Sequence, residues 1–369
     1  MADEDISANL PSLRFEAALT SQENELLYLR ARSHALTLST CAQAAFLVAV
    51  LNDARQKIIE KRSPTKKKSK LLQEAPKRDP LLVGIIGCGR LGKQLTNTLL
   101  KYSDVHPEEI FISTRRPETL SALQSRGVHC GFDNVKVASA VHILFIACLP
   151  SQFSTVAKEI KGHLSCPVYV LTGAIPLARI CQILEYDQII KPEFSWKPKD
   201  KDNGANQKWN CQQELLEILS DPGYCEMTCP LNTEMKENSL VDTNPRLAEL
   251  FLFVFINMCS LKYLSRSEVI TMCNTVFLGF GPIDDMTEAL TEQDIVNDLE
   301  AYAIKTNRIE ADDVERFPLL DLALVYEEQS HLGQRLTHPD GTLRKMFVKR
   351  YKSVFDKFQY WKGMPTHTE

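Results

Sequence analysis

One stretch of this chain constrains its fold more than any other. An apolar run over residues 81–86 leads directly into a glycine-containing turn, and a helical pattern of apolar residues follows as far as Tyr102. A second apolar run, Ile110 to Ile112, comes next and ends in a polar segment. A strand, a turn, a helix and a second strand within about thirty residues form a βαβ unit, because parallel strands need a crossover between them. The sequence therefore predicts an α/β domain that begins near residue 79.

Three glycines in the turn have the spacing Gly-x-Gly-x-x-Gly. Gly87 permits the sharp turn, Gly89 leaves room for a pyrophosphate against the backbone, and Gly92 lets the helix pack closely on the strand. The free N–H groups and positive dipole end of the helix, which begins near Arg90, face the same phosphates. The spacing is weak evidence alone, but its place between a strand and a helix predicts a dinucleotide site. The expected contacts are the six residues of the turn: Gly87, Cys88, Gly89, Arg90, Leu91 and Gly92.

The end of the second strand indicates which dinucleotide binds. A site that prefers NAD usually has Asp or Glu here to accept hydrogen bonds from the ribose 2′-OH, whereas this chain has Thr114, Arg115 and Arg116. Guanidinium groups pair with a 2′-phosphate, often through two bonds at once, and a carboxylate would repel it. We therefore expect NADP as the cofactor, with these three residues near its 2′-phosphate. The alternative is that both arginines are solvated loop charges.

Strands and helices continue to alternate as far as residue 190. Apolar runs predict strands at 128–130, 141–147, 167–173 and 188–190, with helices at 118–125, 152–160 and 176–184. Ser151 is the expected N-cap of the second of these helices. Ligands of such sheets lie beyond the carboxyl ends of the strands. We therefore expect further residues beside the cofactor: Cys148, Leu149, Pro150, Thr172 and Gly173.

Helical patterns flank this domain on both sides. One runs from about Ser21 to Lys61, and the basic tract that follows, 61–70, is either a solvated linker or a nuclear localisation signal. After a polar insert at 196–210, expected to be a mobile loop, periodicity predicts helices at 247–264, 269–280, 286–303, 317–332 and 344–360. The expected fold is α/β: a doubly wound Rossmann-type parallel sheet with an all-helical C-terminal domain and an N-terminal helical extension. The expected domains are 1–78 (N-terminal helical extension and basic linker), 79–225 (NADP-binding domain) and 226–369 (helical C-terminal domain).

Charge and composition argue against several other classes of protein. The net charge of −4 and the pI near 6.1 disfavour nucleic acid as a partner. The acidic N-terminus lacks the basic region of a signal peptide, and the longest apolar run, Ala44 to Leu51, is too short to span a bilayer. Among the eleven cysteines, Cys225 and Cys229 are not followed by a His or Cys pair at zinc spacing. We expect reduced thiols, no metal, no membrane partner and a cytoplasmic location.

The chain resembles the pyrroline-5-carboxylate reductases over roughly residues 81–190. The segment 84–92 (GIIGCGRLG) is similar to that family's N-terminus, 113–118 (STRRPE) to the end of its second strand, and 144–150 (LFIACLP) to a strand that ends in Val-Lys-Pro. The resemblance implies NADP(H) in this domain and a reductase ancestry. The family's Ser-Gly-Ser-Gly-Pro-Ala segment, which helps form its substrate pocket, is nearest to Phe277–Pro282 here, where Gly-x-Gly-Pro is kept and the serines are absent. The resemblance therefore carries over no catalytic residue.

These features predict an NADP(H)-dependent oxidoreductase that reduces a C=N or C=O bond of a small metabolite of unknown identity. The alternative, favoured by the altered segment 279–282, is a non-catalytic NADP(H)-binding or interaction protein with a degenerate substrate pocket. Catalytic residues are unknown: His142 is expected to be a hydrogen-bonded core residue and Cys148 a packed thiol. Hydride transfer needs no protein nucleophile, because the cofactor carries that chemistry. The apolar helix 247–264 packs either against other helices or, with the aromatic C-terminal segment, across a homodimer interface.

Overall fold

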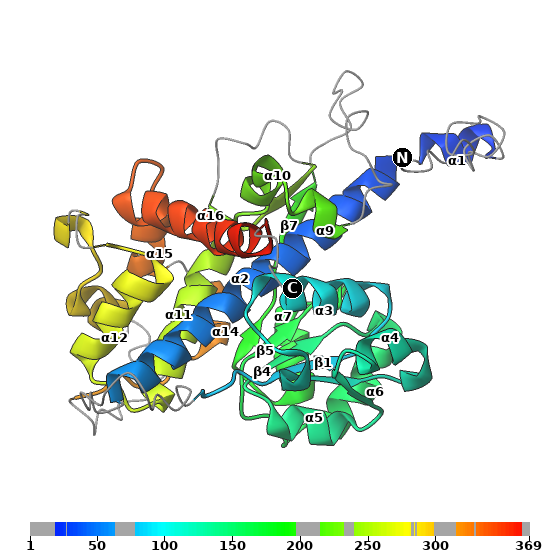
Figure 1. The fold of residues 1–369 in the computed structure, drawn as a ribbon, viewed down its shortest axis with the longest axis horizontal. Coiled ribbons are helices and arrows are strands. Elements are labelled where there is room, and N and C mark those ends of the chain that lie inside the picture. Colours follow the sequence, from blue (N-terminus) through cyan, green and yellow to red (C-terminus); the bar gives the residue numbers. More distant parts are fainter. Residues whose placement is uncertain are drawn as a thin grey trace, which may run out of the picture.

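A six-stranded parallel sheet organises the middle of the chain in the computed structural model (Figure 1). The structure describes residues 19–26, 28–62, 78–196, 215–231, 240–281, 284, 286–298, 315–327 and 330–363. The strand order is β3-β2-β1-β4-β5-β6, so the direction of winding reverses between β1 and β4. The strands are β1 (Val83–Ile86), β2 (Ile110–Ser113), β3 (His129–Gly131), β4 (Ile143–Ile146), β5 (Val168–Val170) and β6 (Ile189–Ile190). The predicted doubly wound Rossmann-type sheet is confirmed.

Alternate side chains of each strand enter two separate cores, one on each face of the sheet. Ile143 and Phe145 of β4 join the core that includes α3 (Arg90–Tyr102), whereas Leu144 and Ile146 join the opposite core. Helices α5 (Asn134–Ala140), α6 (Pro150–Ile160) and α7 (Leu177–Leu184) cover that opposite face. Both faces are thus shielded from water, as a parallel sheet requires. Short pieces complete this region: η4 (Pro107–Glu109), η5 (Pro117–Leu120) and α4 (Ser121–Gln124).

The predicted N-terminal helix forms, as α1 (Ser21–Glu25) and α2 (Tyr28–Arg62), but α2 lies in the middle of the molecule. Figure 1 shows it running between the sheet and the C-terminal helices. Phe46 is fully buried, and its ring centroid lies 4.8 Å from that of Tyr351 and 5.2 Å from that of Phe347. By length and composition the segment Ser21–Arg62 could cross a membrane, yet 83% of its most apolar window is buried inside the protein. Its apolar surface is therefore accounted for by the core, and "extension" describes its place in the sequence only.

The C-terminal part packs mainly as helices around α2. These helices are α9 (Leu215–Ile218), α10 (Pro222–Met227), α11 (Arg246–Leu261), α12 (Arg266–Met272), α14 (Leu322–Glu327), α15 (His331–Thr337) and α16 (Thr342–Gly363), with the 3₁₀ turn η8 (Met286–Glu288). A two-stranded antiparallel sheet of β7 (Phe194–Trp196) and β8 (Val241–Thr243) accompanies them. These two short strands were not predicted from the sequence. The domain boundaries expected at 78 and 225 stay predictions.

Several local expectations need correction. The helices predicted at 286–303 and 317–332 are each interrupted: η8 is separate from a helix over 292–298, and α14 is separate from α15. Ser151 is not the N-cap of α6: the helix begins at Pro150 with Leu149 as N-cap, because the fixed φ of proline suits the first helical position. The predicted helix 118–125 splits into η5 and α4. The predicted helix 269–280 changes after Met272 into the π-helical turn η7 (Cys273–Phe277). The basic tract beyond residue 62 and the insert beyond residue 196 lie outside the described residues.

Candidate functional site

The glycine turn joins β1 to α3 at the carboxyl edge of the sheet. Gly87 has φ of 91°, which a residue with a side chain rarely adopts, and its N–H donates to the Ser113 carbonyl oxygen at 2.9 Å. A Cβ on Gly87 would lie 2.8 Å from the backbone nitrogen of Cys148, and a Cβ on Gly92 would collide with the Gly87 carbonyl oxygen. A Cβ on Gly89 would meet no atom within 4 Å. The turn is therefore packed against protein at Gly87 and Gly92 and open at Gly89.

The start of α3 presents its backbone N–H groups at this opening. Gly89 is the N-cap without a side-chain cap, and the first hydrogen bond of the helix runs from Lys93 N to Gly89 O at 3.0 Å. The N–H groups of the preceding residues have no partner within the helix, which suits an anion. Arg90 is exposed beside them. Cys88 is buried, and burial raises the pKa of its thiol to about 11, so it can offer a ligand its backbone only.

The loop after β4 lies directly against the glycine turn. Ala147 N donates to Ile86 O at 2.8 Å, and the Thr172 hydroxyl, at the end of β5, donates to the Cys148 carbonyl at 3.0 Å. Burial raises the pKa of the Cys148 thiol, which lies 3.8 Å from the Thr172 hydroxyl, so this cysteine is a packed thiol as expected. Leu149 is 62% exposed, and a helix starts at Pro150. The structure thus brings Cys148, Leu149 and Pro150 to the same edge as the glycines.

The two arginines after β2 are both exposed and differ in their contacts. Thr114 N donates to Gly131 O at 2.8 Å, which fixes the backbone just before them. With the Gln152 side-chain oxygen turned toward it, the Arg115 guanidinium donates to that oxygen from both terminal nitrogens, at 2.8 and 3.0 Å. The Arg116 carbonyl accepts from the Thr119 hydroxyl at 2.8 Å. Gln152 was not predicted, because nothing in its sequence position connects it to Arg115.

The N-terminal half of α2 brings additional positive charge to this edge. Burial lowers the pKa of His34, and the charges of Arg90 and Arg30 lower it further. The Cys41 thiol interacts with the Thr98 hydroxyl further along, so α2 runs beside α3 in the same direction. No local pattern in the sequence indicates this contact, because it depends on how two separate helices pack against each other.

His142 is a half-buried residue whose ring and backbone are both hydrogen-bonded to Leu82. The Nδ1 atom of its ring accepts a hydrogen bond from Leu82 N at 2.9 Å, and its backbone N–H donates to Leu82 O at 2.8 Å. Burial and the charges of Arg55 and Lys262 lower its pKa to about 4, so the ring is neutral near pH 7. It precedes β4, at the amino end of the sheet, and therefore lies away from the glycine turn.

The loop around Gly279, part of the segment compared above with the reductases' Gly/Ser-rich segment, is held in place by α16 and α2. Gly279 has φ of 75°, and a Cβ there would lie 3.0 Å from Cδ of Arg350. Arg350 donates to the Val276 carbonyl at 2.8 Å and to Asp53 of α2 at 2.7 Å. Lys357 forms ion pairs with both Asp53 and Asp104. Asp104 lies between α3 and β2. These contacts place the loop toward the amino ends of the strands, whereas the glycine turn lies at their carboxyl ends.

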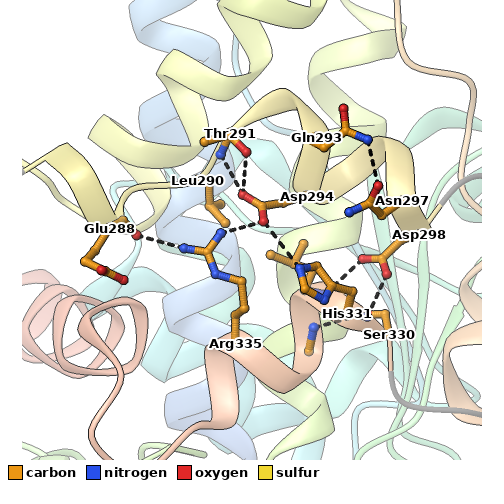
Figure 2. A network of polar contacts seen from close by, with 12 residues as sticks. Glu288, Leu290, Thr291, Gln293, Asp294, Asn297, Asp298, Ser330, His331 and Arg335 are labelled. Atoms are coloured by element: carbon orange, nitrogen blue, oxygen red, sulfur yellow. Dashed lines mark hydrogen bonds and ion pairs between the residues drawn. The ribbon is translucent and has the colours of Figure 1, made fainter.

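A pocket of about 290 Å³ lies among the C-terminal helices and is separate from the sheet edge. Its lining includes His331, Arg335 and His338. Figure 2 shows that Arg335 and His331 point toward Asp294, with Arg335 at 2.5 Å and the His331 ring at 3.7 Å. Arg335 also donates to the Glu288 carbonyl at 3.1 Å. The arginine beside this pocket is therefore paired within the protein, and the network ties α15 to the helix over 292–298.

Comparison with known proteins identifies the family. The family described as NADP oxidoreductase, coenzyme F420-dependent, matches residues 82–172. NADP-dependent oxidoreductase domain-containing protein 1 of Mus musculus is 36% identical over 73% of this chain and 72% of its own length. Pyrroline-5-carboxylate reductase of Escherichia coli (strain K12) is 29% identical over 29% of this chain and 41% of the enzyme.

Among solved structures, a pyrroline-5-carboxylate reductase from Coxiella burnetii aligns over 76% of this chain and 98% of its own, with 14% identity and a TM-score of 0.29. The family match and the sheet together support a nicotinamide dinucleotide cofactor and a place among the NAD(P)-dependent oxidoreductases. This chain belongs to the family of NADP-dependent oxidoreductase domain-containing protein 1.

Proposed function

We propose that this protein is an NADP(H)-dependent oxidoreductase that reduces a C=N or C=O bond of a small metabolite. The observation that carries the proposal is the open glycine turn at Gly89 with two exposed arginines at the adjoining strand end. Arg115 is exposed and its guanidinium contacts the neutral amide of Gln152, so its charge is available to a 2′-phosphate. Bound NADPH would supply the hydride. A cytoplasmic location, expected from the reduced thiols, belongs to the same proposal.

Different residues at the carboxyl edge of the sheet would bind different parts of the cofactor. The backbone from Gly87 to Gly92 would bind the pyrophosphate, since Gly89 leaves space there and α3 directs its free N–H groups outward. Thr114, Arg115 and Arg116 would bind the 2′-phosphate. The loop 148–150 would line the side toward the nicotinamide, because it follows β4 across the point where the sheet reverses its winding.

A second function is favoured by one specific observation. The loop at Gly279 is fixed by Arg350 and Asp53 away from the glycine turn, and it lacks the small polar side chains suited to a carboxylate substrate. A protein of this kind would bind NADP(H) without turning over a substrate, as a binding or interaction protein.

The test is NADPH oxidation by purified protein over a panel of cyclic imines, ketones and aldehydes. Substrate-dependent loss of NADPH absorbance that disappears in Gly89→Val supports the oxidoreductase. NADPH binding without turnover on any member of the panel favours the non-catalytic alternative. Failure to bind NADPH at all contradicts both.

A further inference from the structure

The contact between Arg115 and Gln152 spans the place where a dinucleotide would lie. Arg115 follows β2, and Gln152 is the third residue of α6, after β4. In the strand order β3-β2-β1-β4, β1 lies between those two strands. The two hydrogen bonds, at 2.8 and 3.0 Å, therefore bridge the carboxyl end of β1, from which the glycine turn emerges.

The chemistry of the pair leaves Arg115 able to bind an anion. A guanidinium has five N–H donors, and Gln152 accepts from the two terminal nitrogens through a single oxygen. The remaining donors are not used in this contact. Because the partner is a neutral amide, the positive charge of Arg115 is kept, whereas a carboxylate in the same place would cancel it. Gln152 thus orients the guanidinium without reducing its attraction for a phosphate.

Because Arg115 is exposed, holding its side chain in one orientation can affect how strongly it binds a ligand. An exposed arginine samples many rotamers and loses that freedom when it binds a ligand. A contact that already restricts the side chain reduces this loss and so favours binding. The effect acts only on ligands that Arg115 touches, so a 2′-phosphate would gain from it and a 2′-hydroxyl would not.

We infer that Gln152 is a positioning residue that holds Arg115 across the crevice and thereby contributes to the preference for NADPH over NADH. This inference rests on the proposed function, because it assigns Arg115 to the 2′-phosphate.

The experiment is a double-mutant cycle on dissociation constants for NADPH and NADH at fixed salt. Gln152→Leu keeps the size of the side chain and removes its hydrogen bonds. It is expected to weaken NADPH binding about two- to tenfold, the range expected when one long side chain is no longer held in place before the ligand binds, and to leave NADH binding unchanged. In an Arg115→Ala background, Gln152→Leu is expected to have no further effect. Ser151→Ala, an exposed neighbour on the same helix, is the matched control.

Each outcome separates the inference from the proposed function. Suppose that Arg115→Ala lowers the preference for NADPH but Gln152→Leu leaves that preference unchanged or raises it. Gln152 would then be neutral or would compete with the phosphate for Arg115. This result overturns the inference, while the proposed function stands. An equal loss from Gln152→Leu with and without Arg115 also overturns it, since the glutamine would then act by another route. A wild-type protein with no preference for NADPH overturns the proposed NADP specificity and this inference with it. Melting curves of all variants identify any loss of folding.

Discussion

The buried carboxyl of Glu249 gives a prediction about how stability depends on pH. Glu249 lies on α11 and is fully buried, and its Oε1 accepts from the hydroxyl and the N–H of Ser330. Its Oε2 has no hydrogen-bond partner among the described residues. Burial raises the pKa of Glu249 from 4.5 to about 7, and the Ser330 hydrogen bonds only partly oppose the rise.

The direction of the pH dependence of stability is set by which state, folded or unfolded, binds the Glu249 proton more tightly. The folded state binds the proton of Glu249 more strongly than the unfolded state does, so the protonated form stabilises the fold. That stabilisation is fully present below the unfolded pKa of 4.5 and is lost as the pH rises through about 7. A pKa difference of this size corresponds to roughly 3 kcal/mol, or about 4 °C in melting temperature for a chain of this length. Asp298, whose pKa burial also raises, adds to the same trend.

Glu249→Gln removes the titrating group while keeping an oxygen for Ser330. We expect the variant to melt at a higher temperature than the wild type at about pH 8, and to lose most of that advantage at about pH 5. The assay is thermal unfolding followed by circular dichroism across this range. The exposed Glu118→Gln is the matched control and should follow the wild type. A constant difference between Glu249→Gln and the wild type at every pH would refute the reasoning.

Three further predictions concern the candidate site and the assembly. Gly92→Ala should lower the free energy of unfolding by about 1–3 kcal/mol in a denaturant titration, because the alanine Cβ would collide with the Gly87 carbonyl oxygen. Unchanged stability would contradict the packing described for the glycine turn. The double variant Arg115→Ala with Arg116→Ala should weaken NADPH binding about ten- to a hundredfold and leave NADH binding nearly unaffected. The measurement is the ratio of the two dissociation constants. An unchanged ratio would mean that both arginines are solvated charges. Homodimerisation stays a prediction, to be measured by light scattering. Most of α11 and three aromatic residues of α16, Phe347, Tyr351 and Phe355, are buried within one chain, so these side chains are not available to a partner. A monomer at micromolar concentration would reject the dimer.

The sequence was most informative where a backbone requirement selects the residue. Gly87 is needed for a positive φ and Gly92 for a close contact with the preceding turn, so the motif located the edge of the sheet correctly. Apolar runs then located the remaining strands, since strands of a parallel sheet are buried on both faces. The parallel, doubly wound arrangement of these strands followed from the alternation of strands with helices, whereas the strand order came from the structure.

Contacts between distant segments could not be predicted in the same way. The packing of α2 against the sheet and α11 depends on the shape of many side chains around Phe46, and helical periodicity does not say which helix is the partner. The contact between Arg115 and Gln152 joins the loop after β2 to the first turn of α6. The fixation of Gly279 by Arg350 depends on the position of the last helix. Each needs a three-dimensional arrangement that no local pattern encodes.

The most direct test of the account is an NADPH titration of wild-type protein and Gly89→Val, followed by fluorescence. The structure leaves open space at Gly89, so a valine there should fit without disturbing the fold and should occupy the position of the pyrophosphate. The account predicts saturable NADPH binding to the wild type, loss of that binding in Gly89→Val, and superimposable melting curves in the absence of cofactor. Equal NADPH affinity in the two proteins would contradict the assignment of the glycine turn as the cofactor site.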